Sequence, residues 1–214
     1  MENSILEFID FKKIDTLLKG FKNTTGLAVA IVDLEGVILS QFQWKKLQKD
    51  FYLKNPETSK WNTNIKLELT QVEKFNFHKN PNGLVEVTIP ILVNEEHFAN
   101  LFSGYFFFEK PDTLFLEKEA KKYGFDEKEY GDAVNLLPVL SLAEIKNTMT
   151  FLIETLHYIF EMAFDKMKEV NLKHILTINK LFLEDIIDNS PALIYVSDLD
   201  GKIKLANNKF AKIF

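Results

Sequence analysis

The chain of 214 residues contains no cysteine. Disulfide bonds, thiolate metal sites and cysteine nucleophiles are therefore excluded, although a chain without cysteine occurs in any redox compartment. The sequence also lacks an apolar run of about 20 residues, the length that spans a bilayer, and an N-terminal apolar segment before a small-residue cleavage site. We therefore expect a cytoplasmic chain with no membrane segment.

Charge of one sign is never concentrated. The net charge is −5, and no block of five like charges occurs, so we expect neither a nucleic-acid partner nor an anionic membrane surface. Motifs of catalysis are missing too, because the sequence has no Gly-rich phosphate loop, no His-x-x-x-His pair and no Gly-x-Ser-x-Gly elbow. We predict that the chain is not an enzyme and holds no metal or cofactor.

What the sequence does contain is a pair of apolar runs in residues 82–109, on either side of a polar hinge at residues 94–97. The second run, residues 98–108, is apolar enough to be buried on both faces, and Ser103-Gly104 indicates a bulge or a close backbone approach. The first run alternates in steps of two, as half-buried strands do, with apolar residues at Val85, Val87, Ile89, Ile91 and Val93. The pattern predicts an antiparallel hairpin with one face open to a ligand.

Other segments show helical spacing or strand patterns with matching end signals. The patterns predict strands at residues 27–33 and 37–42 joined by a turn at Glu35-Gly36, and helices at residues 4–21, 63–74, 112–123 and 126–133. With 46% hydrophobic residues, the chain has enough material for one domain of about 130–150 residues and an extension.

From Ser141 onward the pattern is that of one long helix that begins with a capping box, Ser141 to Glu144. About 48 residues at about 1.5 Å each give a rod on the order of 70 Å, so we expect a parallel homodimer through residues 141–182. The alternative is two shorter helices with a break near residues 168–171. The predicted seam follows a spacing of three and four, with Ile145, Met149, Leu152, Leu156, Ile159, Ala163, Val170 and Leu181 as its apolar members.

The last segment, residues 183–214, resembles the opening of a PAS domain. The letters NSPALIYVSDLDGKI match the usual entry hairpin of that family, and ANNKF matches the helix that begins at an asparagine. Only about a quarter to a third of a PAS domain is present. The alternative is a β-hairpin that packs on the first domain.

The first domain resembles the PocR-type sensory domain. GLAVAIVDLEGVIL, NPET, NGLVEVTIPILV and HFANLFSGYFFFEKPD occur in the family's order, followed by AKKYGFDEKEYGDAV and LPVLS. The resemblance implies an α/β (α+β) fold with a PAS-like antiparallel sheet and flanking helices, which holds a small, propanediol-type or hydrocarbon-derived ligand. It also implies a downstream transmitter, as in two-component sensor histidine kinases.

This copy departs from the family at three positions. Members commonly carry cysteines where this chain has Trp61 and Asn80, and many have Gly-Gln where it has Gly104-Tyr105. The resemblance therefore does not extend to thiol chemistry, and ligand preference is expected to differ.

A pocket between sheet and overlying loop is the expected ligand site, and its candidate ligand-binding residues are Trp61, His78, Glu86, Tyr105 and Phe107. Each has a structural alternative: Trp61 as an anchor of its loop, His78 as a surface or core residue, and Glu86 as a carboxylate facing solvent. Tyr105 offers a hydroxyl to a polar ligand group.

We divide the chain into a sensory domain at residues 1–140, a connecting coiled-coil helix at 141–182 and a PAS fragment at 183–214. The predicted function is that of a small-molecule sensor that passes ligand occupancy through the helix to a PAS or transmitter domain. The alternative is a structural dimerisation module with a filled pocket.

Overall fold

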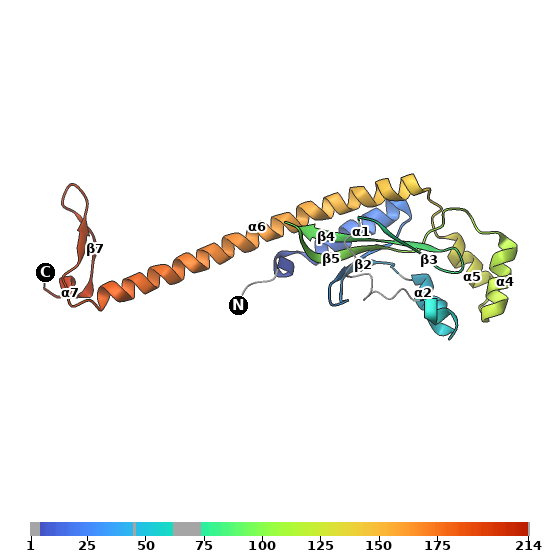
Figure 1. Ribbon diagram of the computed structural model, residues 1–214, viewed down its shortest axis with the longest axis horizontal. Coiled ribbons are helices and arrows are strands. Elements are labelled where there is room, and N and C mark those ends of the chain that lie inside the picture. Colours follow the sequence, from blue (N-terminus) through green and yellow to red (C-terminus); the bar gives the residue numbers. More distant parts are fainter. Residues whose placement is uncertain (1–4, 45, 62–73, 214) are drawn as a thin grey trace. The chain divides into compact units, whose positions relative to one another are not determined.

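The computed structural model describes residues 5–44, 46–61 and 74–213, except for the side chains at positions 60 and 61. One compact unit is Ile9–Met162, and the other consists of Met1–Phe8 and Ala163–Phe214. Figure 1 shows the helices and strands of both units.

An antiparallel sheet is the centre of the first unit. Within the described residues it has five strands in the order β2-β1-β5-β4-β3, so the predicted antiparallel sheet with flanking helices is confirmed. The strands are β1 (Val29–Asp33), β2 (Ile38–Phe42), β3 (Asn76–Lys79), β4 (Val85–Val93) and β5 (Glu96–Ser103). The predicted strands at residues 27–33 and 37–42 correspond to β1 and β2, whereas β3 lies where the sequence predicts no strand.

Strand β4, which pairs with β5 and β3, is buried on both faces. Every residue of β4 except Leu92 is buried, so the expectation of a half-buried strand with an open face is wrong. The reason is that α1 (Phe11–Thr25) and the beginning of α6 (Leu142–Asp188) lie along one face, as Figure 1 shows. On the other face, Trp44 packs against Phe102 of β5.

Short helices connect and flank the sheet, and α4 and α5 lie beyond one of its ends (Figure 1). Asp112 and Asp126 cap the first turns of α4 and α5, as the helix signals predict. The predicted helix at residues 63–74 lies outside the described residues apart from its last position. The short helices of the first unit are α2 (Lys46–Asp50), η2 (Tyr52–Lys54), η3 (Thr58–Trp61), α4 (Thr113–Tyr123) and α5 (Glu127–Asn135), and η1 (Ile5–Phe8) belongs to the other unit.

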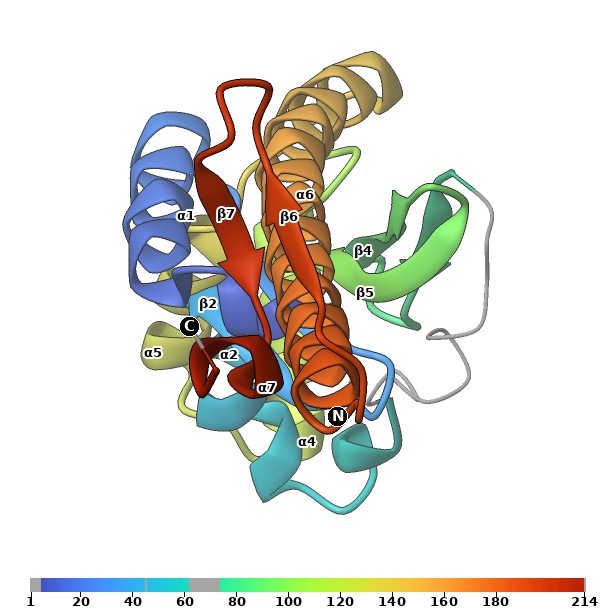
Figure 2. The same cartoon turned by 90° about the vertical axis from the view of Figure 1, so that its left-hand side faces the viewer.

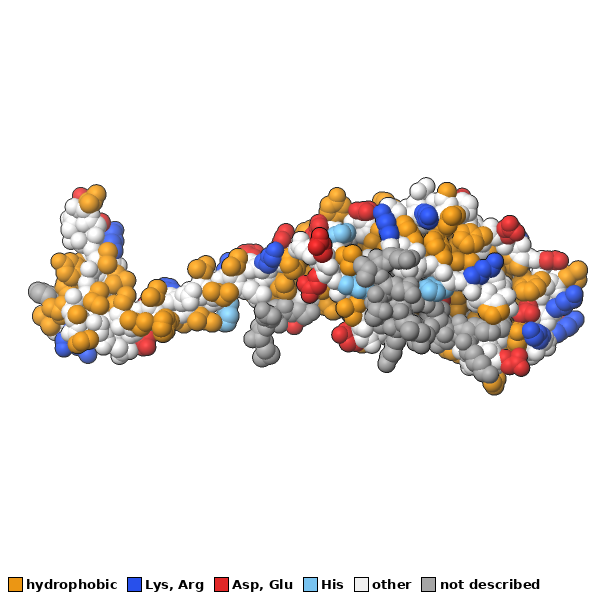
Figure 3. All heavy atoms as spheres, viewed as in Figure 1, with side chains coloured by type: hydrophobic (Ala, Val, Ile, Leu, Met, Phe, Trp, Pro, Cys, Tyr) orange, Lys and Arg blue, Asp and Glu red, His pale blue; other side chains and the backbone are white. Residues whose placement is uncertain are grey.

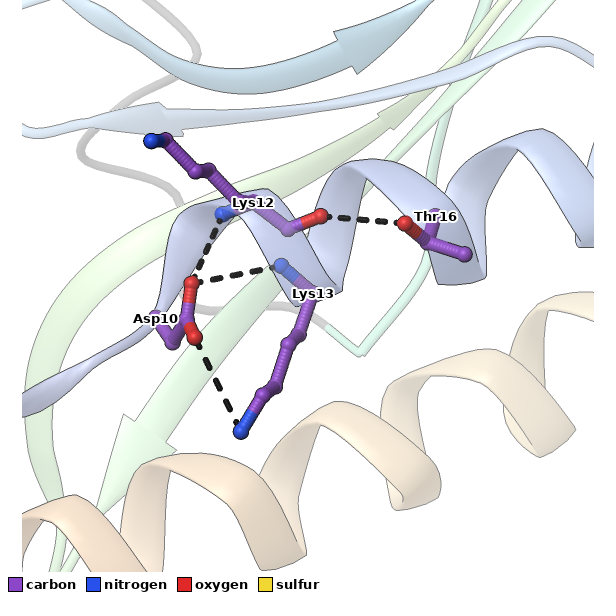
Figure 4. A network of polar contacts seen from close by, with 4 residues as sticks. All are labelled: Asp10, Lys12, Lys13 and Thr16. Atoms are coloured by element: carbon purple, nitrogen blue, oxygen red, sulfur yellow. Dashed lines mark hydrogen bonds and ion pairs between the residues drawn. The ribbon is translucent and has the colours of Figure 1, made fainter.

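Helix α1 begins at a cap that its sequence provides. Asp10 accepts hydrogen bonds at Oδ1 from the backbone N–H groups of Lys12 and Lys13, at 3.2 and 3.4 Å, as Figure 4 shows. These bonds satisfy two of the N–H groups that a helix start leaves unpaired. Thr16 Oγ1 donates to the Lys12 carbonyl within the same turns. The predicted start at residue 4 is too early, because residues 5–8 form the separate helix η1.

Helix α6 runs without a break over 47 residues. Its capping box is formed, because the Ser141 N–H donates to Glu144 Oε2 at 2.8 Å and the Glu144 N–H donates to Ser141 Oγ at 3.2 Å. The single long helix is confirmed, and the alternative of two shorter helices is wrong. Five of the eight predicted seam residues are buried, which are Ile145, Met149, Leu152, Leu156 and Ala163. All of these except Ala163 lie in the first unit, where they contribute to the domain's own core.

The C-terminal segment forms a hairpin of β6 (Tyr195–Ser197) and β7 (Ile203–Ala206), followed by the short helix α7 (Asn208–Ala211). Figure 2 shows the two strands side by side, with α7 next to their base. Asn207, which is 1% exposed, caps α7. Its side-chain amide donates to the carbonyls of Ile187 and Ala192, and its Oδ1 accepts from the N–H groups of Ile194 and Phe210. One side chain therefore ties the end of α6 to the hairpin and to α7.

The β4–β5 hairpin turns within two residues, Asn94 and Glu95. Both have positive φ angles, 49° and 68°, and a two-residue hairpin turn of type I′ requires this conformation at both positions. The turn is shorter than the predicted hinge at residues 94–97, because Glu96 already pairs with Val93. Asparagine tolerates the left-handed region well, whereas glutamate does not.

Replacement of Glu95 by glycine is therefore expected to stabilise the protein. Glycine has no Cβ, so Glu95→Gly relieves the left-handed strain, and we expect the free energy of unfolding in urea to rise by about 0.5–1 kcal/mol. Glu95→Ala removes the same charge but keeps the Cβ, and it should give no such gain. Equal effects of the two substitutions would contradict the assignment of strain to this position.

Candidate functional site

His78 and Glu86 lie beside each other on the neighbouring strands β3 and β4. They are direct partners in the antiparallel ladder, so their side chains project from the same face of the sheet. Glu86 is only 3% exposed, and His78 is half-buried. The alternative in which Glu86 faces solvent is therefore wrong, and the sheet holds a carboxylate inside the domain.

The pairing of β4 with the chain after β5 changes register at Gly104. Before this point Thr88 lies opposite Phe102, and beyond it Val85 and Phe106 exchange two backbone hydrogen bonds of 2.9 and 3.0 Å. The β5 side thus has one residue more than the β4 side, which is the definition of a bulge. The bulge predicted at this position is confirmed.

This register shift brings Tyr105 next to Glu86. Successive residues of an extended chain project to opposite faces, so Glu86 and Tyr105 both project away from the face of Val85 and Phe106. Glu86 is also flanked by His78 on its other side. His78, Glu86 and Tyr105 therefore form one row across the sheet, which we call the polar row.

More polar side chains are buried on the face of the polar row. Asn76 pairs with Thr88 one step further along β3 and β4, and Asn100 lies opposite Pro90. Asn100 is fully buried, and its Oδ1 is 3.1 Å from Nε2 of His97. Its Nδ2 atom has no hydrogen-bond partner among the described residues. A buried N–H group in that state favours any ligand that brings an acceptor.

Apolar clusters lie at both ends of this polar face. At one end Trp44 packs with Ala30, Val32 and Phe102, and its indole N–H donates to the Ser103 carbonyl at 2.8 Å. At the other end Tyr105 and Phe107 are part of a larger cluster, whose other members are Leu47, Tyr52, Leu84, Leu116, Ala120, Tyr130 and Val134. Polar and apolar side chains therefore share this face, which suits a small amphipathic molecule.

Tyr105 packs against further tyrosines in that cluster. The rings of Tyr52 and Tyr105 have centroids 6.2 Å apart, and the hydroxyls of Tyr52 and Tyr130 are 3.1 Å apart. Burial raises the pKa of both Tyr52 and Tyr130, so both hydroxyls stay protonated in the working range of pH. Phe107 is 5% exposed in the same cluster, which supports the reading of the phenylalanine run as core.

The family resemblance implies cysteine at two positions, 61 and 80, and the structure describes the side chain at only one of them. The side chain of Trp61 lies outside the described residues, so its predicted role stays a prediction. Asn80 shapes the turn before β4, because its Oδ1 accepts hydrogen bonds from the backbone N–H groups of Asn82 and Leu84, at 3.0 and 2.9 Å. Asparagine commonly makes such a turn, and a cysteine lacks the oxygen for it.

The backbone of Gly104 approaches β1 closely, and a cavity opens beside it. The Gly104 N–H donates to the Ala28 carbonyl at 2.6 Å, and a Cβ at Gly104 would lie 3.0 Å from that of Ala28. The cavity has a volume of about 220 Å³, and Tyr105 forms part of its wall. A side chain at position 104 would therefore require the strands to move apart by a few tenths of an ångström.

Sequence reasoning missed Asn76, Thr88 and Asn100. Each alternates with apolar residues, but the meaning of that alternation depends on strand pairing. Asn76 belongs to β3, whose four residues are too few for a clear pattern. The sequence does contain one signal for Thr88. It follows Glu86 by two residues within β4, so the two side chains lie on the same face of the strand.

The fold and the buried polar face, together with the hairpin after α6, define a sensory signalling module. Comparison with protein families agrees, because residues 7–164 match the sensory domain found in PocR. Since this match covers more than half of the chain, the chain belongs to that family. Residues 181–214 match the PAS domain, as the resemblance of the entry hairpin predicts. No curated protein matches the chain.

The hydropathy of the helices bears on membrane association. Among the described parts of the chain, no helix is long and apolar enough to cross a membrane. Nor do the described residues contain a cluster of three or more histidine, cysteine or acidic side chains that would hold a metal ion.

The polar row predicts a pH dependence of stability. Burial lowers the pKa of His78, and the Glu86 carboxylate beside it offsets this shift only in part. In the unfolded chain the imidazole takes up a proton at its ordinary pKa of about 6.5. The folded protein binds that proton less readily than the unfolded chain does. The free energy of unfolding is therefore highest above this pH and decreases as the pH falls below it.

His78→Gln should remove this part of the pH dependence. The free energy of unfolding in urea, measured at about pH 7.5 and about pH 5.5, is expected to fall less in the variant than in the parent protein. His174→Gln, at an exposed position of α6, should behave as the parent does. An unchanged difference between the two pH values in His78→Gln would show that His78 is not the responsible group.

Proposed function

We propose that this sensory module binds a small polar molecule on the sheet face that carries the polar row, and that α6 passes ligand occupancy to the PAS domain and to a transmitter such as a histidine kinase. The observation that supports the proposal is the row of His78, Glu86 and Tyr105 together with the buried amide of Asn100. A domain built for its own stability alone gains little from burying a carboxylate and several amides. The proposal assigns binding, and no catalysis, to the chain.

The chemistry of the row limits the ligand. A carboxylate such as Glu86 only accepts hydrogen bonds, so the ligand group next to it is a hydroxyl or an amine. Asn100 offers an N–H donor on the same face. It lies opposite Pro90, about 13 Å along β4 from Glu86, so a small ligand at Glu86 does not reach it. Small diols, of the kind that the family resemblance implies, and small amino alcohols provide such a donor group.

One observation favours a second function, that of a structural module whose pocket is filled. Tyr105 and Phe107 pack in an aromatic and aliphatic cluster with Tyr52 and Tyr130, so these two predicted ligand residues are engaged in the core. If the same held for the whole face, no ligand would find room. A binding experiment separates the two functions.

A thermal shift assay on the full chain tests for a ligand, with 1,2-propanediol and a panel of small diols and amino alcohols. A ligand at 100 times its Kd stabilises the folded state by about 2.7 kcal/mol, which for a chain of this size raises Tm by roughly 5–10 °C. Glu86→Gln should reduce the shift, because the amide carries no charge and accepts more weakly. Tyr105→Phe should reduce it as well.

The matched control is Glu96→Gln, which removes the same charge at an exposed position of the same hairpin. This variant should respond to each ligand as the parent does. A panel without any response would favour the filled module. Equal shifts in parent, Glu86→Gln and Tyr105→Phe would mean that the ligand binds elsewhere.

We further propose that the chain forms a parallel homodimer through the exposed part of α6. Beyond Ala163 the helix carries large apolar side chains that are more than half exposed, and Figure 3 shows such side chains along it. We call the following set the apolar stripe: Leu172, Ile175, Leu176, Asn179, Phe182, Leu183 and Ile186. Its members recur at the spacing of three and four that a coiled coil requires.

Asn179 lies in the middle of the apolar stripe and is its single polar member. A lone asparagine in such a seam fixes register and strand number, because it is best satisfied opposite its own counterpart. This is the argument for a second copy of the chain as the partner. The stripe differs from the predicted seam, which contains Leu181. Leu181 follows Leu172 by nine residues, about two and a half turns, and so lies on the opposite side of the helix.

Two neighbouring residues allow an experiment that distinguishes the apolar stripe from the predicted seam. Phe182 lies in the stripe and Leu181 outside it, and their exposures are nearly equal, 62% and 60%. We expect Phe182→Glu to convert the dimer to a monomer in light scattering, because it places two charges against each other in an apolar seam. Leu181→Glu should leave the dimer intact. The reverse result would support the seam predicted from the sequence, and a monomeric parent would remove the dimer altogether.

A further inference from the structure

The cavity beside Gly104 is separate from the polar row, although Tyr105 borders both. It lies between the end of α1, the segment around α2 and the end of α5. His78, Glu86 and Asn100 take no part in its wall. Its volume of about 220 Å³ exceeds the roughly 150 Å³ that suffices for a benzene molecule in an apolar cavity.

The inner wall of this cavity is apolar. Ala28 and Gly104 form one side, at the close approach of the two strands, and Leu47 lies on α2. The end of α5 and the loop after it contribute Ala133 and Leu137, and Leu136, which is 78% exposed, lies at the rim. Such a wall suits a small aliphatic or aromatic group.

Charged side chains at the same cavity are mainly cationic. Lys22 from α1 and Lys46 from α2 border it, together with the single carboxylate of Asp50. Within the part of the chain that the structure describes, neither lysine forms an ion pair. The cavity is therefore positive in balance and has an ammonium group available.

Lys22 is the more deeply placed of the two lysines. It is half-buried, whereas Lys46 is exposed, and its Nζ donates a hydrogen bond to the Gly26 carbonyl at the end of α1. Burial lowers the pKa of Lys22, because the ammonium loses water without gaining a counter-ion. An anion that enters the cavity would supply that counter-ion.

The loop at the cavity wall is held in a conformation that most side chains avoid. Gln43 borders the cavity and has a positive φ of 54°. Non-glycine residues in the left-handed region occur more often at ligand sites than elsewhere, because surrounding structure must hold them there.

We propose that this cavity binds a small monocarboxylate with an apolar body, whose carboxylate pairs with Lys22 and Lys46 and whose body contacts Leu47, Ala133 and Leu137. The site is an additional one, so that the domain takes a polar ligand on the sheet face and an organic acid at the end of the sheet. A charge-assisted hydrogen bond from a half-buried ammonium is stronger than one between neutral groups.

Benzoate and benzamide test the charge requirement, because they have nearly the same shape and differ by one charge. Isothermal titration of the full chain should give a Kd at least about tenfold lower for benzoate than for benzamide, the usual range for a charge-assisted bond over a neutral one. Lys22→Gln keeps a donor near the Gly26 carbonyl but removes the charge. It should weaken benzoate about tenfold and leave benzamide unchanged.

Three further variants keep the outcome clear. Lys46→Gln should weaken benzoate binding as well, which covers the case of a Lys22 variant that does not fold. Ala133→Phe fills the cavity and should abolish binding of both molecules. Lys128→Gln removes the same charge at an exposed position of α5 and should have no effect.

The proposal is overturned if neither molecule binds, if both bind equally, or if both lysine variants bind benzoate as the parent does. Glu86→Gln separates this site from the polar row. Benzoate affinity that survives in Glu86→Gln supports two sites, even if no diol binds anywhere. Benzoate affinity that is lost in Glu86→Gln would overturn the assignment to the cavity.

Discussion

The pairing of β4 with β5 is the interaction on which the other parts of the sensory unit depend. These strands occupy the middle of the sheet, between β1 on one side and β3 on the other. The two-residue turn at Asn94 and Glu95 starts their register. The register shifts by one residue between Ile91 and Leu92 and then continues to the pair of Thr88 and Phe102. Up to Ser103 this register keeps apolar side chains on the face of α1 and α6. If the ladder slipped by one residue, Glu86 and Thr88 would enter that core.

The bulge at Gly104 then changes what the far end of the sheet offers. Without it, the face that carries Glu86 would receive the neighbours of Tyr105 instead of Tyr105 itself. The same glycine allows the backbone to approach Ala28, at which point the sheet ends and the cavity begins. The bulge at Gly104 thereby places Tyr105 in the polar row, and the glycine itself forms part of the cavity wall. The glycine at 104 is thus more constrained by geometry than the tyrosine that follows it.

Local chemistry made much of the fold predictable. Asp112 before α4 and the box of Ser141 and Glu144 before α6 are end signals that act within one turn of helix, and each forms the bonds expected of it. The alternation in β4 likewise identified a strand. His78 and Glu86 were found as site candidates because ionisable side chains beside apolar runs are conspicuous.

The remainder depends on contacts that sequence spacing does not contain. A spacing of three and four shows that a helix has an apolar side, but not whether that side meets a sheet or another chain. Ile145 and Met149 obey the spacing and pack inside their own domain, whereas Leu172 obeys it and is exposed. The pairing of Thr88 with Asn76 is equally unpredictable from the sequence, because β3 is too short to be recognised as a strand on its own.

Asn207 has a mechanical consequence for signalling. Its four hydrogen bonds use both atoms of one amide to hold the end of α6, the strand β6 and the start of α7. None of these partners can move alone without breaking one of these part-buried bonds, so the network holds the three ends together. Under the proposed function, a rotation of α6 about its axis would therefore carry the first strands of the PAS segment with it. The response of the downstream domain would then depend on the angle through which the helix turns.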